Sequence, residues 1–346
     1  MSLKISIIGG GVAGLCVARE LVDRGADITL YERGDGIGKH ACSWWAGGML
    51  APYCEGETAE DIVVQLGLKA ADWWQKSVGK GAKSGRKGAE KAQKVRKNGT
   101  LVVSLARDHA DLQRFTRRTK YFTRLDADEI SRLEPDLKDR FSKGLFFENE
   151  AHLSPREVMM TLRDLLVFEG VKFIRDEVEP ELIAKDGLTI DCRGLAAKDN
   201  LADLRGVKGE MLMLSCLDVN ISRPVRLLHP RIPIYIVPRG DGIYMLGATM
   251  IESSGGKYAT ARSVLELLSA AYALNPAFGE AEILEIGVDS RPAFPDNIPR
   301  VGKNGNVISI NGLYRHGFLL APAMAQMVAA HIFDNKSLEM KHEYSA

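Results

Sequence analysis

Near its N-terminus the chain reads Lys4-Ile5-Ser6-Ile7-Ile8-Gly9-Gly10-Gly11-Val12-Ala13-Gly14. The first five residues form a short apolar run that predicts a buried strand. The glycines then have the spacing G-x-G-x-x-G, at the turn into a predicted helix. Gly9 permits a tight turn, Gly11 lets a diphosphate approach the backbone, and Gly14 lets the helix pack closely on the strand. The free N–H groups and the positive dipole end of that helix suit an anionic ligand.

A second strand completes this unit. Gly25 is a credible end for the helix, and residues 28–31 form another apolar strand that ends at Glu32, 18 residues after Gly14. A carboxylate at that place can accept hydrogen bonds from ribose hydroxyls, and it would repel a 2′-phosphate. The strand–turn–helix–strand order predicts a Rossmann-like dinucleotide-binding fold that takes FAD or NAD rather than NADP.

The composition is that of a globular protein of about two domains. The chain has 346 residues, of which 45% are hydrophobic and 26% charged, and 46 Lys+Arg against 45 Asp+Glu leave a net charge of +1. This charge gives no global field for a polyanion or an anionic membrane. Five cysteines without a C-x-x-C spacing argue against a zinc site or a disulfide framework. With no leader pattern and no uninterrupted membrane-length apolar run, we expect a cytoplasmic location and no membrane contact.

Residues 40–52, H-A-C-S-W-W-A-G-G-M-L-A-P, are unusually rich in small side chains, which would let the backbone pass close to a flat ring system. At this segment the sequence resembles the D-amino-acid-oxidase-like FAD-dependent oxidoreductases. Within them it is most similar to the glycine oxidases of thiazole (thiamine) biosynthesis. The resemblance implies that the flavin is lined by Ser43, Ala46, Gly47, Gly48 and Met49.

Three later motifs extend the resemblance over nearly the whole chain. Residues 234–238 and 243–246 are alternating strands joined by Arg239-Gly240-Asp241-Gly242, a hairpin signal, and they lead into Gly247-Ala248-Thr249-Met250. Residues 291–302 read R-P-A-F-P-D-N-I-P-R-V-G, and residues 311–322 read N-G-L-Y-R-H-G-F-L-L-A-P. The last motif joins a strand to an apolar helix around residues 321–332, whose positive N-terminal end would stabilise an anionic reduced flavin.

The glycine motif and the resemblance together imply FAD, held noncovalently. Relatives of the sarcosine-oxidase type attach the flavin to a C-terminal cysteine, and no cysteine follows Cys216 here. The expected cofactor contacts are Gly9, Gly11, Val12, Ala13, Gly14, Glu32, Arg33, Ser43, Ala46, Gly47, Gly48, Met49, Val178, Gly312, Arg315, His316, Gly317, Phe318 and Leu319.

The resemblance also assigns the substrate site. Arg291 would pair bidentately with a substrate carboxylate, as a planar guanidinium does best, and Tyr235 would add a hydrogen bond. Arg315 is placed as a second arginine near the pocket, and Met250 as a pocket wall. The family often has a histidine two residues before the strand tyrosine, where this chain has Pro233. His229 lies nearby but out of register.

The implied reaction is oxidation of glycine or another small amino acid by hydride transfer from the substrate Cα to flavin, with O2 reoxidising the flavin to give H2O2. A D-amino-acid or sarcosine-type oxidase or dehydrogenase is the main alternative, and an NAD-dependent dehydrogenase is another. A third is a flavin-bearing RNA-associated protein that uses the basic residues of segment 76–97. That segment has no aromatic residue for stacking, so a nucleic-acid partner is disfavoured. A homo-oligomer is compatible with the sequence.

The motifs predict two domains that alternate along the chain. Residues 1–75, 146–205 and 286–346 would form a discontinuous α/β FAD-binding domain. Residues 76–145 and 206–285 would form an α+β substrate-binding domain around an antiparallel sheet. The latter includes a helix near residues 261–274, for which Ser263 and Glu266 suggest a capping box.

Overall fold

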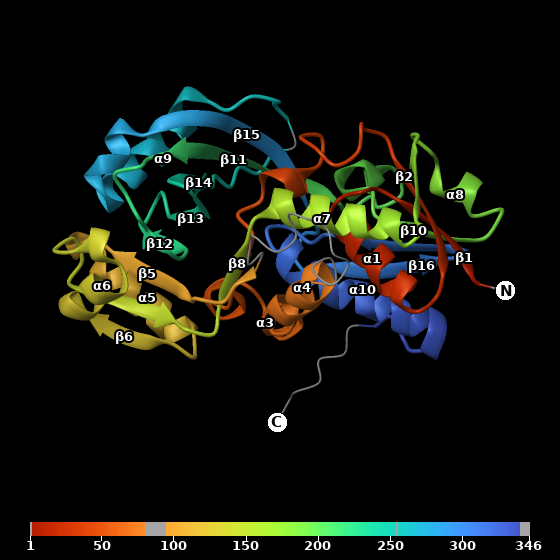
Figure 1. Ribbon diagram of the computed structural model, residues 1–346, viewed down its shortest axis with the longest axis horizontal. Helices are drawn as coiled ribbons and strands as arrows, with labels where there is room; N and C mark the ends of the chain where they lie inside the picture. The colour runs from red at the N-terminus through yellow and green to blue at the C-terminus, as the bar shows by residue number, and fades with distance from the viewer. Residues whose placement is uncertain (1, 80–94, 254, 340–346) are drawn as a thin grey trace.

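The structure, a computed structural model, describes residues 2–79, 95–253 and 255–339 of the chain (Figure 1). The N-terminal strand lies in a six-stranded sheet with the order β16-β17-β10-β1-β2-β9. These strands are β1 (Lys4–Ile8), β2 (Asp27–Glu32), β9 (Lys172–Arg175), β10 (Leu188–Asp191), β16 (Arg300–Asn304) and β17 (Val307–Asn311). Because β1 pairs in parallel with both β2 and β10, the predicted Rossmann-like sheet is confirmed.

Helix α1 (Val12–Asp23) follows β1 directly, as the glycine motif predicts. Its apolar positions are buried, and it packs against α7 (Pro155–Phe168) and α10 (Gly317–Asp334). The helix ends where expected, because Gly25 has a φ of +83° and donates its N–H to the carbonyl of Val22 at 2.9 Å. A left-handed residue of this kind closes a helix with least strain when it is glycine.

The second sheet has eight strands in the order β15-β11-β14-β13-β12-β5-β7-β6 and is antiparallel except between β12 and β5. It contains β5 (Thr100–Ser104), β6 (Thr123–Asp126), β7 (Lys143–Phe147), β11 (Arg205–Ser215), β12 (Val225–Leu228), β13 (Ile234–Gly240), β14 (Ile243–Gly247) and β15 (Glu282–Ala293). The proposed domain limits at 145/146 and 285/286 fall inside β7 and β15. The division into two domains therefore stays a prediction.

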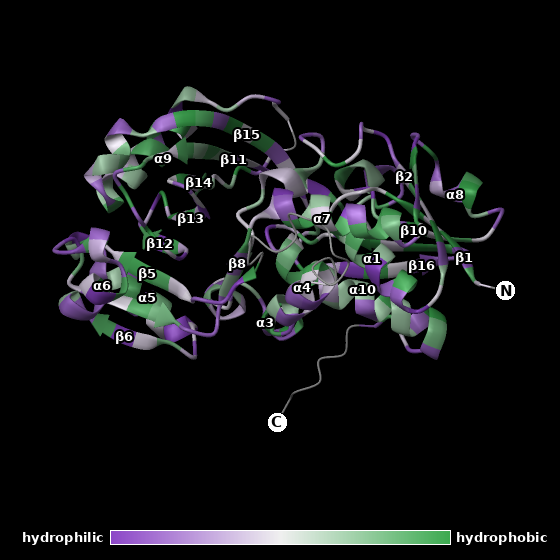
Figure 2. Ribbon diagram, in the orientation of Figure 1, coloured by the Kyte–Doolittle hydropathy of each residue, from purple (hydrophilic) through white to green (hydrophobic). Residues whose placement is uncertain are grey.

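The remaining elements connect and cover the two sheets. A three-stranded sheet is made of β3 (Met49–Leu50), β8 (Ala151–Leu153) and β4 (Val95–Arg96). The other α-helices are α2 (Pro52–Glu55), α3 (Asp61–Gly67), α4 (Ala70–Gly79), α5 (His109–Arg118), α6 (Ala127–Leu133), α8 (Pro180–Ile183) and α9 (Ala261–Leu274). Short 3₁₀ turns are η1 (Cys42–Trp45), η3 (Ala106–Asp108), η4 (Pro135–Leu137), η5 (Gly194–Asp199) and η6 (Pro276–Glu280). Figure 2 shows hydrophobic segments along the strands of both large sheets, whereas the peripheral helix α6 is mostly hydrophilic.

Two local predictions are wrong. The N-cap of α9 is Thr260, whose hydroxyl accepts the N–H of Ser263 at 3.2 Å, so the capping residue lies three positions before the predicted one. Arg239 and Gly240 belong to β13, and the hairpin turn consists only of Asp241 and Gly242, both with positive φ. An Asp-Gly pair suits this tight turn because both residues tolerate positive φ.

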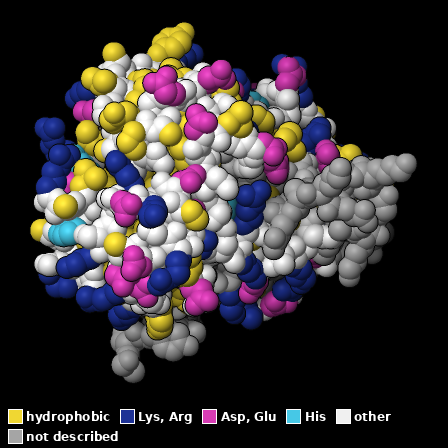
Figure 3. All heavy atoms as spheres, turned by 60° about the vertical axis from the view of Figure 1, so that its left-hand side comes forward, with side chains coloured by type: hydrophobic (Ala, Val, Ile, Leu, Met, Phe, Trp, Pro, Cys, Tyr) yellow, Lys and Arg dark blue, Asp and Glu magenta, His cyan; other side chains and the backbone are white. Residues whose placement is uncertain are grey.

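Charged side chains are spread over the surface. Figure 3 shows Lys and Arg interspersed with Asp and Glu on one face, in agreement with the near-neutral total. Residues 80–94, which make up most of the basic segment 76–97, lie outside the described residues. Within the described part of that segment, Lys97 forms an ion pair with Asp72 of α4. The RNA-binding alternative stays a hypothesis.

Helix α10 is long and apolar enough to span a membrane by length and composition, although half of its 18-residue window is buried inside the protein. It packs against α1, α3 and α4. The central helix of a globular core has the same composition, and we interpret α10 in this way.

Helix α10 begins at Gly317, four residues before the predicted start, so Pro322 lies inside the helix rather than at its beginning. Proline has no N–H, so the carbonyl of Phe318, four residues earlier, loses its helical partner. The indole N–H of the fully buried Trp74 donates to this carbonyl at 2.8 Å. A side chain from α4 thus supplies the missing hydrogen bond and fixes the first turn of α10.

We predict that Trp74→Phe lowers the free energy of unfolding by about 1–3 kcal/mol, because it leaves the buried Phe318 carbonyl unpaired. Urea unfolding followed by fluorescence and circular dichroism measures the change. Trp73→Phe is the matched control, since the Trp73 indole donates to the partly exposed Glu20, where water can replace it. A loss of the same size in both variants would contradict the role given to Trp74.

Candidate active site

Two adjacent cavities lie where the sheets meet. The larger has a volume of about 430 Å³ and the smaller about 250 Å³. Both cavities are lined by residues 46–47, by Tyr235, Ala248 and Arg291, and by Arg315 together with the first residues of α10, Gly317 and Phe318. The cavities therefore share residues from five separate segments of the chain.

The smaller cavity follows the glycine motif and the end of β2. Of the expected cofactor residues, it is lined by Gly9, Gly11, Val12, Ala13, Glu32, Arg33, Ser43, Ala46, Gly47, Val178, Arg315, Gly317 and Phe318. The larger cavity adds Gly48, Met49, His316 and Leu319. Gly14 and Gly312 line neither cavity: Gly14 packs on the backbone of Gly9, and Gly312 packs beside the ring of Phe294.

The smaller cavity has the features that a dinucleotide requires. A Cβ built on Gly11 would have only one atom within 4 Å, the hydroxyl oxygen of Ser43 at 3.4 Å. Because Gly11 has no side chain, this space beside the turn is left for a ligand. That hydroxyl accepts the N–H of Val12 at 3.1 Å and ties segment 42–45 to the start of α1. Glu32 lies at the end of β2 and accepts the N–H groups of Gly10 and Gly34 at 2.6 and 3.1 Å.

Arg239 holds the segment that lies between the cavities. Its guanidinium donates to the carbonyls of Leu153, Ala46 and Gly47 at 3.1, 3.3 and 2.8 Å. Burial, and then the nearby charge of Arg156, lower the pKa of Arg239 to about 10. The side chain still carries its charge at neutral pH. It thereby fixes backbone that lines both cavities.

The larger cavity brings together all four expected substrate residues. Arg291 lies near the end of β15, Tyr235 on β13, Met250 just after β14, and Arg315 just before α10. The guanidinium of Arg291 donates to the carbonyl of Thr249 at 3.1 Å. A Cβ on the neighbouring Gly209 would lie 2.3 Å from this guanidinium, so a larger residue at position 209 would displace the guanidinium from its present place.

Among the arginines that line the larger cavity, Arg291 alone has no ion pair with a described carboxylate. Arg114 and Arg118 approach Glu57, and Arg226 and Arg315 bind Glu55. Arg291 is therefore the guanidinium in this cavity whose charge is least neutralised by the protein.

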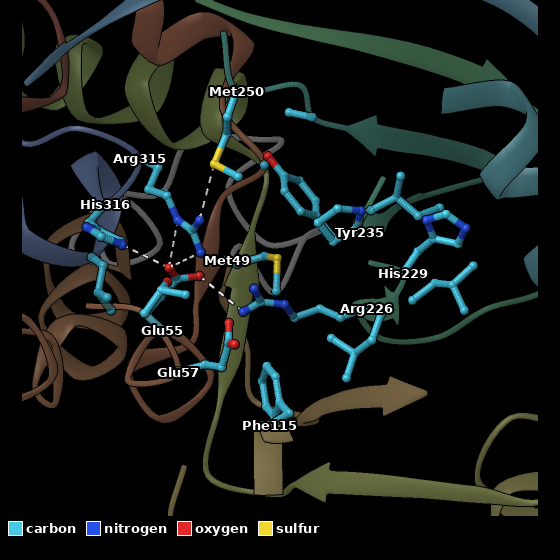
Figure 4. Close-up of a pocket in the computed structure, with 18 of the residues that line it drawn as sticks. Met49, Glu55, Glu57, Phe115, Arg226, His229, Tyr235, Met250, Arg315 and His316 are labelled. Atoms are coloured by element: carbon cyan, nitrogen blue, oxygen red, sulfur yellow. Dashed lines mark hydrogen bonds and ion pairs between the residues drawn. The ribbon is translucent and has the colours of Figure 1, made fainter. Parts of the chain in front are cut away.

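Glu55, from α2, is the principal residue that the sequence did not indicate. Figure 4 shows its carboxylate surrounded by Arg315, His316 and Arg226. Oε2 accepts from Nε and Nη2 of Arg315 at 2.9 and 2.6 Å and is 2.8 Å from Nε2 of His316. Oε1 accepts from Nη1 of Arg226 at 3.2 Å.

Electrostatics keep Glu55 ionised. Burial alone would raise its pKa, but the charges of Arg315 and Arg226 outweigh burial and hold the pKa well below its usual range. Burial also lowers the pKa of His316, so this ring is neutral at neutral pH. Two signals in the sequence could have pointed here: Glu55 ends an uncharged run over residues 41–54, and Arg226 interrupts the apolar strand β12.

His229 and Pro233 both line the larger cavity; Pro233 stands at the family's histidine position, and His229 lies four residues before it. Nδ1 of His229 accepts the N–H groups of Arg231 and Ile232 at 3.2 and 3.0 Å. In the neutral ring the proton is therefore assigned to Nε2. Met250 is half exposed at the rim, and its sulfur accepts from Nη1 of Arg315 at 3.4 Å.

Residues 4–331 match the family described as FAD dependent oxidoreductase (DAO). The chain belongs to this family. A Rhizobium etli protein, provisionally named as the thiamine biosynthesis oxidoreductase ThiO, is 49% identical over 95% of this chain and 96% of its own length. A glycine oxidase of Pseudomonas aeruginosa is 25% identical over 95% of this chain and 94% of its own. The crystal structure of glycine oxidase from Bacillus cereus has a TM-score of 0.84 at 21% identity, covering 97% of this chain and 98% of that one.

The protein is therefore an FAD-dependent oxidoreductase, and the NAD-dependent alternative is wrong. The smaller cavity would hold the dinucleotide, with its diphosphate near Gly11 at the start of α1 and its ribose near Glu32. When bound, FAD accepts two electrons and a proton, as a hydride, from an organic substrate. Residues 46–47 and the N-terminal turn of α10 line both cavities, so a group held in the smaller cavity would lie next to the larger one.

Glu150 lies beside the cluster of Glu55, Arg226 and Arg315, and its pKa is close to neutrality. It is fully buried, and its Oε1 accepts the N–H of Cys54 at 2.8 Å. Burial raises the pKa of Glu150 from 4.5 to about 7, against the opposing effects of that hydrogen bond and of Arg226. A carboxyl whose pKa is raised by folding stabilises the fold fully below its unfolded pKa and loses this contribution as the pH rises.

We predict that the stability of Glu150→Gln relative to wild type increases by roughly 3 kcal/mol between pH 4.5 and about pH 8, at about 1.4 kcal/mol per pKa unit. Urea unfolding of both proteins across this range measures the difference. The exposed Glu148→Gln is the control and should stay within about 0.5 kcal/mol of wild type. A pH-independent difference for Glu150→Gln would show that the carboxyl does not titrate in this range.

Proposed function

We propose that the enzyme oxidatively deaminates glycine or another small amino acid. The observation that carries the proposal is Arg291, a guanidinium in the larger cavity that has a carbonyl partner and no carboxylate within ion-pair distance among the described residues. A substrate carboxylate supplies the missing anion, and the planar guanidinium can bind it bidentately. The relative named glycine oxidase supports the same substrate class, and the relative named ThiO supports a role in thiamine synthesis.

The side chains of the larger cavity bind and orient the substrate. Arg291 and the hydroxyl of Tyr235 hold the carboxylate, and Met250 closes the rim beside Arg315. The Cα of the substrate is then held beside residues 46–47, where the two cavities adjoin, so that it can meet the cofactor directly. Fixed orientation of this kind lowers the barrier mainly by removing the entropy cost of alignment. An amine that binds neutral needs no side chain as general base.

The proposed overall reaction is balanced by O2. The amine loses a hydride and a proton and becomes an imine, and O2 takes up the two electrons and two protons to give H2O2. The imine then either hydrolyses to the oxo acid or serves thiazole formation in thiamine synthesis. We further propose that FAD is bound noncovalently and that the enzyme is cytoplasmic, with a homo-oligomer as a compatible assembly.

A second candidate substrate class is favoured by the size of the cavity. A volume of about 430 Å³ exceeds what glycine fills, so sarcosine or a small D-amino acid would also fit. A hydrophobic wall discriminates one methylene by only about 1–3 kcal/mol. The cavity wall alone therefore gives only a modest preference among these amines.

We predict that glycine bleaches the flavin absorbance band under anaerobic conditions and that air restores it with formation of H2O2. Sarcosine, D-alanine and D-proline should be compared with glycine at equal concentration, with simple amines such as ethylamine as the control. If no amino acid reduces the flavin, the proposed function is wrong.

We predict that Arg291→Met lowers kcat/KM for glycine by about 100-fold, mainly through KM, because a charged hydrogen-bonded pair contributes roughly 1.5–3 kcal/mol. Its effect on an amine without a carboxylate should be much smaller. Arg114→Met is the matched control, because Arg114 lines the same cavity but is half exposed and pairs with Asp111 at 3.0 Å. Equal effects of Arg291→Met on carboxylated and simple amines would contradict the carboxylate-binding role.

A further inference from the structure

The larger cavity contains more positive charge than a monocarboxylic substrate requires. Besides Arg291, the guanidinium groups of Arg226 and Arg315 line it, and both side chains are largely buried, at 12% and 21% exposed. Each of these two arginines is bound by the single carboxylate of Glu55. Of these three arginines, Arg291 is open to a ligand, and the other two are already occupied by a protein carboxylate.

The carboxylate of Glu55 occupies these arginines as a ligand would. One oxygen receives two N–H groups of Arg315 and faces His316, and the other receives Arg226. The two arginines come from β12 and from the turn before α10, so they approach the carboxylate from different elements (Figure 4). His316 adds no compensating charge because burial keeps its ring neutral.

We propose that Glu55 determines specificity by occupying the place of a second substrate carboxylate. The inference rests on the proposed function, in which Arg291 binds the first carboxylate. An amine with two carboxylates would meet filled guanidinium groups and the negative charge of Glu55. Like charges in a desolvated site disfavour the wrong ligand more strongly than they weaken the right one. The enzyme therefore prefers amines with a single carboxylate although its cavity has room for larger ones.

Glu57 provides the matched comparison. It lines the same cavity, but it lies 3.9 and 4.0 Å from Arg114 and Arg118, whose side chains are more than half exposed. Removing its charge changes the net charge of the cavity as much as removing that of Glu55. It frees no buried arginine, however, because water already screens its partners.

The test is carried out on the FAD-loaded enzyme with acetate and succinate, which bind without reacting and are followed by the change in the flavin spectrum. Wild type should bind acetate more tightly than succinate. In Glu55→Gln the ratio of succinate to acetate affinity should rise by about tenfold or more, because Arg226 and Arg315 lose their internal partner. In Glu57→Gln the ratio should change less than about twofold.

Turnover gives a second readout of the same change. The ratio of kcat/KM for iminodiacetate to that for glycine should rise about tenfold in Glu55→Gln and stay constant in Glu57→Gln. Because the binding measurement needs no reaction, it tests Glu55 even if glycine fails to reduce the flavin. Failure of the proposed function and failure of this inference are therefore distinguishable.

Glu55→Asp covers the case in which Glu55→Gln does not fold. The shorter side chain keeps the charge but cannot reach both arginines, so we expect a smaller rise, of about threefold. Succinate should also raise the Tm of either variant more than acetate does. Tighter binding of succinate than acetate by wild type, an unchanged ratio in the Glu55 variants, or an equal rise in Glu57→Gln would each overturn the proposal.

Discussion

Three hydrogen bonds from one half-buried arginine organise the centre of this enzyme. Arg239 extends from β13 and holds the carbonyls of Ala46, Gly47 and Leu153. It thereby joins the eight-stranded sheet to the three-stranded sheet and to the segment between the two cavities. Buried carbonyls need donors, and a guanidinium can satisfy three of them from one position. The shape of both cavities depends on this arrangement, because residues 46–47 line each of them.

In the larger cavity, one carboxylate likewise satisfies several groups, in this case by neutralising buried positive charges. A buried guanidinium is costly unless an anion faces it, and one carboxylate, Glu55, faces two of them. Arg291 is treated differently, since its partner is a neutral carbonyl. The protein thus neutralises the arginines that it needs for structure and leaves one available for an external anion.

The parts of the fold that depend on neighbouring residues were predictable from the sequence. The strand at residues 4–8, the glycine turn, α1 with its end at Gly25, and the acid at Glu32 all follow from patterns within about 30 residues. The substrate-site residues needed the family resemblance, because nothing local distinguishes Arg291 from a surface arginine. The structure places all four in one cavity, and their roles stay predictions.

What could not be predicted depends on contacts between distant parts of the chain. Glu55 meets Arg226 and Arg315 across 171 and 260 residues, and the local sequence does not specify such pairs. The early start of α10 has the same origin, because a tryptophan 244 residues away supplies the hydrogen bond that Pro322 removes. The shift of the α9 cap to Thr260 is a smaller error of a different kind, since Ser263 has an equally suitable hydroxyl.

The order of the six-stranded sheet has a consequence for how the protein is made. β1 is synthesised long before β17, at residues 307–311, yet its neighbour β10 pairs with β17, and α10 covers the same part of the fold. The glycine motif therefore has no complete cofactor cavity until β17 and α10 have been synthesised. Assembly of so many non-local contacts is slow, and the nascent N-terminal unit must stay soluble without its final partners. FAD can therefore bind to a complete site only after β17 and α10 have been synthesised and have packed on the sheet.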